Sequence, residues 1–148
     1  MKPLFILLTC IAAFFAQPSF ATEKEATPSS VLKSFNATFN TATDVEWTAT
    51  ESLYKARFVL NGQVVNAYYS TDGEMLAVTR NITSHQLPLV LQTGLKKAYS
   101  NLWITDLFEL NNEEGTTYYV TLENGDQKLV LKSAGGSGWS LYGKTRKN

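Results

Sequence analysis

Residues 58–75 read FVLNGQVVNAYYSTDGEM, and this stretch decides the fold class. Apolar and polar residues alternate on both sides of Asn61-Gly62. Asn-Gly strongly favours a two-residue hairpin turn, because both residues tolerate a positive φ. Asp72-Gly73 marks a second turn before Met75. The stretch therefore predicts three antiparallel strands joined by two turns.

Asp72 and Glu74 raise the alternative of a metal site. A helix–loop–helix calcium loop needs oxygen ligands at alternate positions and a closing Glu at its twelfth residue. Here only Glu74 alternates with Asp72, and no further acid precedes Arg80. We interpret the segment as a structural turn, and we expect neither a metal nor a cofactor.

Helical periodicity occurs on both sides of this meander. The upstream helix has apolar residues at helical spacing: Val31, Leu32, Phe35 and Phe39. The downstream helix opens at Leu87-Pro88, where proline costs no hydrogen bond, and its apolar face holds Leu91, Leu95, Ala98 and Leu102.

Alternating strands follow each predicted helix. The further strands cover residues 45–48, 103–110, 116–123, 128–132 and 139–142. Asn61-Gly62 falls opposite Asn124-Gly125, and Asp72-Gly73 falls near Gly135-Gly136. The sequence therefore predicts an α+β fold with a tandem repeat, residues 31–80 and 84–143. Each repeat would hold one helix and about four antiparallel strands, and the helices would pack on one face of a curved sheet.

The first residues predict export. Lys2 precedes an apolar run from Leu4 to Phe15, and Ser19-Phe20-Ala21 offers small residues for a signal peptidase. We predict a signal peptide over 1–21, cleaved after Ala21, and a flexible leader over 22–30. Cys10 comes too early in the apolar run for a lipoprotein signal, so we do not expect lipidation. The mature chain would then be periplasmic or secreted.

Composition narrows the class of partner. The chain has 13 Lys and Arg, 13 Asp and Glu, and one Cys, which leaves with the signal. A neutral balance without a basic cluster argues against nucleic acid, and no later apolar run could span a membrane. Residues 144–148 carry positive charge and are expected to form a basic tail.

Several motifs point to one family. They are Phe39 with Ala42, Val45 and Trp47; the run 54–58; the Asp72-Gly73 turn; and Leu87-Pro88 leading to Tyr99. With these the chain resembles the β-lactamase-inhibitor-like, PepSY-like family of small secreted bacterial proteins, frequent in Bacteroidota. The resemblance covers 31–143 as one domain. Asn40-Thr41 departs from it, because Pro-Gly often follows the first helix in that family.

The resemblance implies helices on one side of a curved sheet and no established catalysis. The inhibitors after which the family is named bind an enzyme through the open sheet face. Here, strand alternation places Lys55, Arg57, Tyr68 and Tyr119 on the face away from the helices. Tyr and Arg are common interface anchors, although Tyr also simply favours strands. We name these four as candidate binding residues.

The sequence offers few side chains that could act together in catalysis. His85 is the only histidine, and Gly136-Ser137-Gly138 lies in a glycine-rich turn rather than a strand-to-helix elbow. Glu113-Glu114 are adjacent on a loop, and Asp106 with Glu109 forms no recognisable dyad. We therefore expect a non-enzymatic protein that binds a protein or peptide of the cell envelope, with inhibition as one form. The alternative is a carrier for a small apolar or envelope-derived ligand between helices and sheet.

Overall fold

The computed structural model describes residues 26–148. The predicted signal peptide, its cleavage after Ala21 and Cys10 lie outside these residues. The helices are α2 (Ser29–Thr38), the short 3-10 helix η1 (Ser84–Gln86) and α3 (Leu89–Ala98). The strands are β1 (Thr43–Ala49), β2 (Tyr54–Leu60), β3 (Gln63–Tyr69), β4 (Met75–Asn81), β5 (Trp103–Asn112), β6 (Gly115–Glu123), β7 (Gln127–Ala134) and β8 (Ser140–Arg146).

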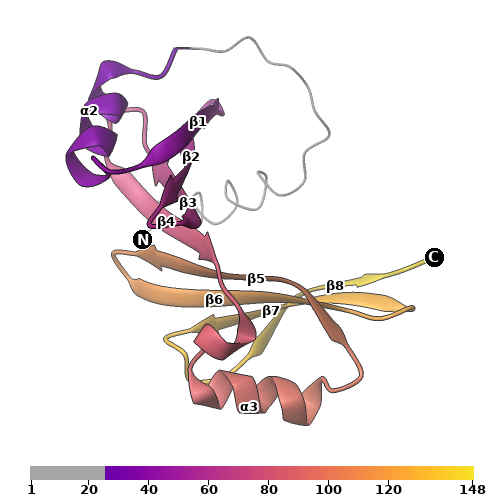
Figure 1. The fold of residues 1–148 in the computed structure, drawn as a ribbon. Coiled ribbons are helices and arrows are strands. Elements are labelled where there is room, and N and C mark those ends of the chain that lie inside the picture. The colour runs from indigo at the N-terminus through magenta and orange to yellow at the C-terminus, as the bar shows by residue number, and fades with distance from the viewer. Residues whose placement is uncertain (1–25) are drawn as a thin grey trace.

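The eight strands form one antiparallel sheet in sequence order, β1 to β8 (Figure 1). Along the chain, α2 precedes β1–β4, and α3 precedes β5–β8. The α+β class and the antiparallel sheet with two helices are thereby confirmed.

The two Asn-Gly turns differ in geometry. Asn61 and Gly62 have φ values of 51° and 79°, as a type I′ hairpin requires, so this prediction is confirmed. The loop between β6 and β7 is one residue longer, and the side-chain oxygen of Asn124 accepts the backbone N–H groups of Asp126 and Gln127. A capped three-residue loop replaces the I′ turn there.

An aromatic core holds α2 to the first strands. Phe35 of α2 is 3% exposed and contacts Trp47 and Phe58, with ring centroids 5.2 Å and 5.0 Å away. Both contacts are edge-to-face, the arrangement that aromatic rings prefer. The remaining buried members of this core are Val31, Tyr54, Ala56, Val65, Ala67 and Tyr69.

An aliphatic core holds α3 to the later strands. Leu91 and Leu95 pack on buried residues of β5, β6 and β7: Leu107, Val120, Leu122, Leu129 and Leu131. The indole N–H of Trp139 donates to the carbonyl of Leu91 at 2.9 Å, which ties the β7–β8 loop to the helix.

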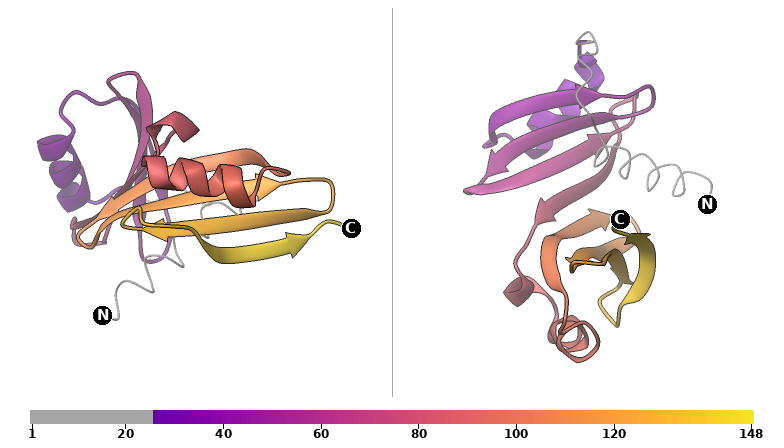
Figure 2. Two further views of the ribbon diagram at one scale, coloured as in Figure 1. Left: turned by 90° about the horizontal axis from the view of Figure 1, so that it is seen from below. Right: turned by 90° about the vertical axis from the view of Figure 1, so that its right-hand side faces the viewer.

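Both helices lie on the same face of the sheet. Ala67 beneath α2 pairs with Val78, and Val78 pairs with Asn111, which shares its face with Leu107 beneath α3. The sheet bends between its halves, and the helices cover the convex side (Figure 1, Figure 2). The opposite side is the concave face.

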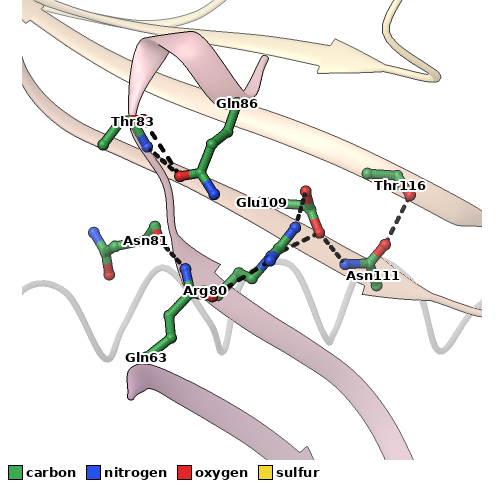
Figure 3. A network of polar contacts seen from close by, with 8 residues as sticks. All are labelled: Gln63, Arg80, Asn81, Thr83, Gln86, Glu109, Asn111 and Thr116. Atoms are coloured by element: carbon green, nitrogen blue, oxygen red, sulfur yellow. Dashed lines mark hydrogen bonds and ion pairs between the residues drawn. The ribbon is translucent and has the colours of Figure 1, made fainter. Parts of the chain in front are cut away.

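A polar network joins the halves on the helix side (Figure 3). Arg80 of β4 donates from Nε and a terminal nitrogen to the two carboxylate oxygens of Glu109 on β5, each at 3.2 Å. Glu109 also accepts from Asn111 at 2.7 Å, and Arg80 reaches Gln63 at 3.4 Å. The network lies between the aromatic core beneath α2 and the aliphatic core beneath α3.

The helix exits and the C-terminus refine the sequence predictions. Phe39 and Tyr99 end their helices alike, each donating its N–H four residues back and each followed by a turn to Ala42 or Leu102. The presence of Asn40-Thr41 instead of Pro-Gly therefore does not make the end of α2 different from the end of α3. At the other end, β8 continues to Arg146, so Lys144 and Arg146 belong to a strand instead of a basic tail.

Candidate functional site: the concave face of the sheet

The concave face is built from alternate residues of neighbouring strands. Register places Lys55 beside Tyr68, Arg57 beside Asn66, and Tyr119 beside both Phe108 and Lys132. All four predicted binding residues therefore lie on this face. Neither helix packs here, because both helix cores use the opposite set of residues.

The four predicted residues are not equally exposed. Arg57 is exposed and Lys55 is half-buried. Tyr68 and Tyr119 are only 0% and 4% exposed, and they join one apolar cluster with Leu53, Ala77 and Leu110. The face is therefore not a plain solvated sheet surface. The bend brings strands of both halves together over a small core of its own.

An aromatic stack extends this cluster toward solvent. The Phe108 and Tyr119 rings stack at 5.0 Å with 15° between their planes, and Tyr142 of β8 meets Tyr119 edge-on at 5.5 Å. The Lys132 ammonium lies 5.9 Å from the Tyr119 ring centroid, within cation–π range. Tyr142 is 46% exposed and forms the accessible part of the stack.

Sequence reasoning missed Phe108 and Tyr142. Phe108 could have been found, because it alternates with Leu110 on the predicted strand. Tyr142 could not, because a register shift in the β7–β8 pairing, between Val130 and Leu131, decides which face it joins.

Burial changes the acid–base behaviour of this face. Burial lowers the pKa of Lys55, and the positive charge of Arg57 lowers it further. Burial raises the pKa of Tyr119 to about 12, with Tyr142 adding to the effect. Burial also raises the pKa of Tyr68. Both tyrosines are neutral at physiological pH, while Lys55 has a weakened hold on its proton.

Charges at one end of the face are matched. Glu123 of β6 lies 2.7 Å from the Lys147 ammonium and 3.8 Å from that of Lys128. The hydrogen bond from Lys147 holds the pKa of Glu123 below its usual range. Lys147 also lies 5.8 Å from the ring centroid of Trp103. At this end the carboxylate pairs with the two ammonium groups, and these contacts hold the last residues of the chain in place.

The residues considered for catalysis lie apart. His85 is exposed in η1, Glu113 and Glu114 form the tip of the β5–β6 turn, and Asp106 accepts a hydrogen bond from Asn81 at 2.9 Å. Over residues 26–148, no three His, Cys, Asp or Glu side chains gather as metal ligands. Nor does any helix in that range have the length and apolarity to cross a membrane.

One surface pocket lies away from the concave cluster. It is lined by Asp126, Gln127, Lys144 and Arg146, from the β6–β7 loop, the start of β7 and the end of β8.

Comparison with known proteins places the fold. No family model and no curated protein sequence matches the chain. A BLIP-like protein from Bacteroides fragilis NCTC 9343 superposes with a TM-score of 0.70 at 20% identity, covering 84% of this chain and 89% of that chain. A DUF2874 family protein from Bacteroides uniformis ATCC 8492 gives 0.72 at 17% identity, covering 82% and 90%.

A third structure, described as a "putative periplasmic" protein of Bacteroides eggerthii DSM 20697, gives a TM-score of 0.73 at 15% identity, covering 82% and 90%. None of the three descriptions names an enzymatic activity. The resemblance to β-lactamase-inhibitor-like proteins is confirmed for the fold, whereas nothing here supports its PepSY-like part. The chain thus has the fold of the BLIP-like and DUF2874 proteins of Bacteroides.

Proposed function

We propose that the mature chain is an exported, non-enzymatic binding protein that holds a protein or peptide segment on its concave face. The observation that carries the proposal is the stack of Phe108, Tyr119 and Tyr142 on a face that neither helix covers. Interface hot spots are rich in tyrosine and arginine and lie in well-packed surroundings.

The packing of the stack supports binding with little reorganisation. Tyr119 stacks on Phe108 and meets Tyr142 edge to face, so its ring is held by two aromatic neighbours. An aromatic surface that is already ordered loses little side-chain entropy when a partner docks. Tyr68 and Tyr119 would then form the floor, and Lys55, Arg57 and Tyr142 the accessible contacts.

Export is part of the same proposal. The N-terminal pattern of a charged start, an apolar run and small residues is typical of a signal peptide. The Bacteroides eggerthii structure shares the fold and is described as a "putative periplasmic" protein. A partner in the cell envelope fits both observations, and enzyme inhibition is one form such binding could take.

The carrier alternative lacks a supporting observation. Its ligand would lie between helices and sheet, yet large side chains fill these spaces: Phe35 beneath α2 and Leu91 beneath α3, at 3% and 0% exposure. We therefore rank it second.

We further infer that the two halves are copies of one ancestral unit. Pro28 and Pro88 are the N-cap residues of the two helices. A Cβ on Gly73 would meet Ser30 near the first cap, and a Cβ on Gly136 would meet Pro88 at the second. Equivalent turns therefore touch equivalent helix starts, which supports a tandem repeat.

The experiment is affinity capture from envelope extract of the source bacterium with three forms of the mature protein. They are the parent, a concave variant carrying Arg57→Gln and Lys132→Gln, and a matched convex control carrying Lys96→Gln and Lys97→Gln on exposed positions of α3. Each variant loses the same charge. We expect one partner to bind the parent and the control, and to be lost by the concave variant.

Circular dichroism first establishes that all three forms are folded. A partner that both variants retain, or that only the control loses, would contradict the concave face as the binding surface.

A further inference from the structure

The last strand of the sheet has a free edge. Within residues 26–148, β8 pairs with β7 on one side and has no strand to bond on the other. The backbone N–H of Lys147, just after β8, donates to the carbonyl of Asp126 on the β7 side. Because these groups alternate in direction along an antiparallel strand, the backbone N–H and C=O groups of Lys144 and Arg146 point away from β7. The pairing is regular over this part of β8, since its one register shift lies before Gly143.

The side chains of Lys144 and Arg146 are free as well. Both are exposed, and neither forms an ion pair with any residue that the structure describes. Their neighbours differ in this respect, because Lys128 and Lys147 are both held by Glu123. The free edge of β8 therefore carries two uncompensated cations.

The two cations share one side of the sheet. Lys144 pairs with Leu129, which is buried beneath α3, and Arg146 pairs with Gln127, two residues before Leu129. Both side chains therefore point to the helix side, opposite to the concave face. They line a pocket of about 580 Å³ together with Gln127 and Asp126. Asp126 pairs with neither cation, so the lining has more positive than negative charge.

An acidic strand would satisfy both kinds of free group at once. In β-augmentation, an extended segment adds to a sheet edge through main-chain hydrogen bonds, and its alternate side chains give specificity. Side chains opposite Lys144 and Arg146 would lie two residues apart on one side of the added strand. Because opposite charges at cross-strand positions attract, the edge favours a segment in which two acids are separated by one residue.

A second copy of the chain fits this edge poorly. β8 contains no acid, so its pairing with β8 of a second copy would gather four cations and no carboxylate. On the other edge strand, β1, Glu46 lies on the concave side, because it pairs with Arg57, 3.7 Å away. Asp44 lies where the register of β1 is shifted, with a φ of 53°. A β1–β8 contact would thus give Lys144 and Arg146 no acid in register on their side.

We propose that the outer edge of β8 binds an extended acidic segment of another protein as a ninth strand. The main chain of the segment bonds to Lys144 and Arg146, and two of its carboxylates, two residues apart, pair with their side chains. This site is independent of the concave-face function, because Tyr142 of the same strand is turned to the concave side, where it meets Tyr119.

Selection from a phage-displayed library of random dodecapeptides tests the proposal. The mature parent is the bait. The counter-baits are an edge variant carrying Lys144→Gln with Arg146→Gln, and a matched control carrying Lys96→Gln with Lys97→Gln on α3. We expect the selected peptides to carry two acids separated by one residue. Their affinity should fall about tenfold or more for the edge variant and stay unchanged for the control.

N-methylation of a selected peptide tests the added strand itself. A methyl group removes one main-chain N–H, so it should abolish binding at alternate positions, where the N–H faces β8, and leave binding unchanged at the positions between. Equal effects at successive positions would overturn strand addition.

Three results of the selection would overturn the edge site: peptides without the acidic pattern, peptides that bind the edge variant as tightly as the parent, or no peptides at all. Peptides retained by the edge variant but lost by the concave variant, Arg57→Gln with Lys132→Gln, would overturn the edge site and support the concave face. A parent dimer in sedimentation velocity that Lys144→Pro disperses, by removing the outward N–H, would assign the edge to a second copy and overturn the acidic partner.

Discussion

Tyr69 shows how burial of a single polar group can set the response of this protein to pH. Its ring lies beneath α2 at 0% exposure, and its hydroxyl has no hydrogen-bond partner among residues 26–148. Burial raises its pKa to about 12 from an ordinary value of 10.0. Once the pH is high enough for the unfolded chain to ionise this tyrosine, the folded state, which keeps the proton, loses stability relative to the unfolded state.

The alkaline limit of stability follows from this shift. Below pH 10 the phenol is neutral in both states, so its contribution is constant; between 10 and 12 only the unfolded state ionises, so the free energy of unfolding falls. We expect Tyr69→Phe to lose less stability over this range than the parent. Urea unfolding of both proteins at several pH values measures it.

The same substitution tests the hydroxyl itself near neutral pH. Removing a buried hydroxyl without a partner should leave the free energy of unfolding unchanged or raise it by about 1 kcal/mol. A loss of more than about 1 kcal/mol would mean that the hydroxyl does make a stabilising hydrogen bond.

Turns and helix starts are coupled at the scale of elements. The β3–β4 turn presses against the beginning of α2, where a Cβ on Gly73 would come within 2.8 Å of the Ser30 carbonyl oxygen. Gly73 also has a φ of 89°. Gly62 has a similar φ of 79°, but a Cβ there would meet nothing within 4 Å. Substituting Gly62 therefore tests the cost of the positive φ alone, whereas substituting Gly73 adds the cost of a steric clash.

Gly73→Ala should therefore cost more than Gly62→Ala. We expect about 1 kcal/mol for Gly62→Ala from the positive φ alone, and at least about 2 kcal/mol for Gly73→Ala, because α2 must also shift. Thermal unfolding of both variants makes the comparison. Equal losses would show that the turn does not fix the position of α2.

Local signals decided what the sequence could predict at this scale. The period-two runs and Asn61-Gly62 located β2 and β3, with β2 found at its observed bounds, because alternation and turn chemistry are local. The length of β8 was underestimated. Lys147, the residue that follows β8, makes nonlocal contacts that no local pattern reveals: its backbone N–H donates to Asp126, and its ammonium pairs with Glu123.

The candidate site was predictable in part for the same reason. Alternation assigned Lys55, Arg57, Tyr68 and Tyr119 to one face, as the register shows. Alternation could not reveal the curvature of the face, which buries Tyr68 and Tyr119 in one cluster. Curvature depends on how whole strands twist and shift, so an open polar surface was expected where a small aromatic core lies.

The two halves are joined across the whole molecule by the β4–β5 pairing and the Arg80–Glu109 ion pair. The Glu109 side chain is 13% exposed, so its two bonds from Arg80 are poorly screened by water. The Arg57–Glu46 pair, at 52% and 72% exposure, is a matched surface pair in the same sheet.

A double-mutant cycle should distinguish these pairs. We expect a coupling energy of about 1–3 kcal/mol between Arg80→Met and Glu109→Gln, and below about 0.5 kcal/mol between Arg57→Met and Glu46→Gln. Urea unfolding of the single and double variants gives both values. Equal couplings would show that the Arg80–Glu109 pair does not hold the halves together.

At the scale of the whole molecule, we propose that partners dock on the concave face. Site-specific photo-cross-linking tests this most directly, with p-benzoylphenylalanine replacing Tyr142 on the concave side or Val90 on the convex α3, which are 46% and 61% exposed. We expect a cross-linked partner from position 142 and none from position 90. A partner captured from position 90 but not from position 142 would contradict it.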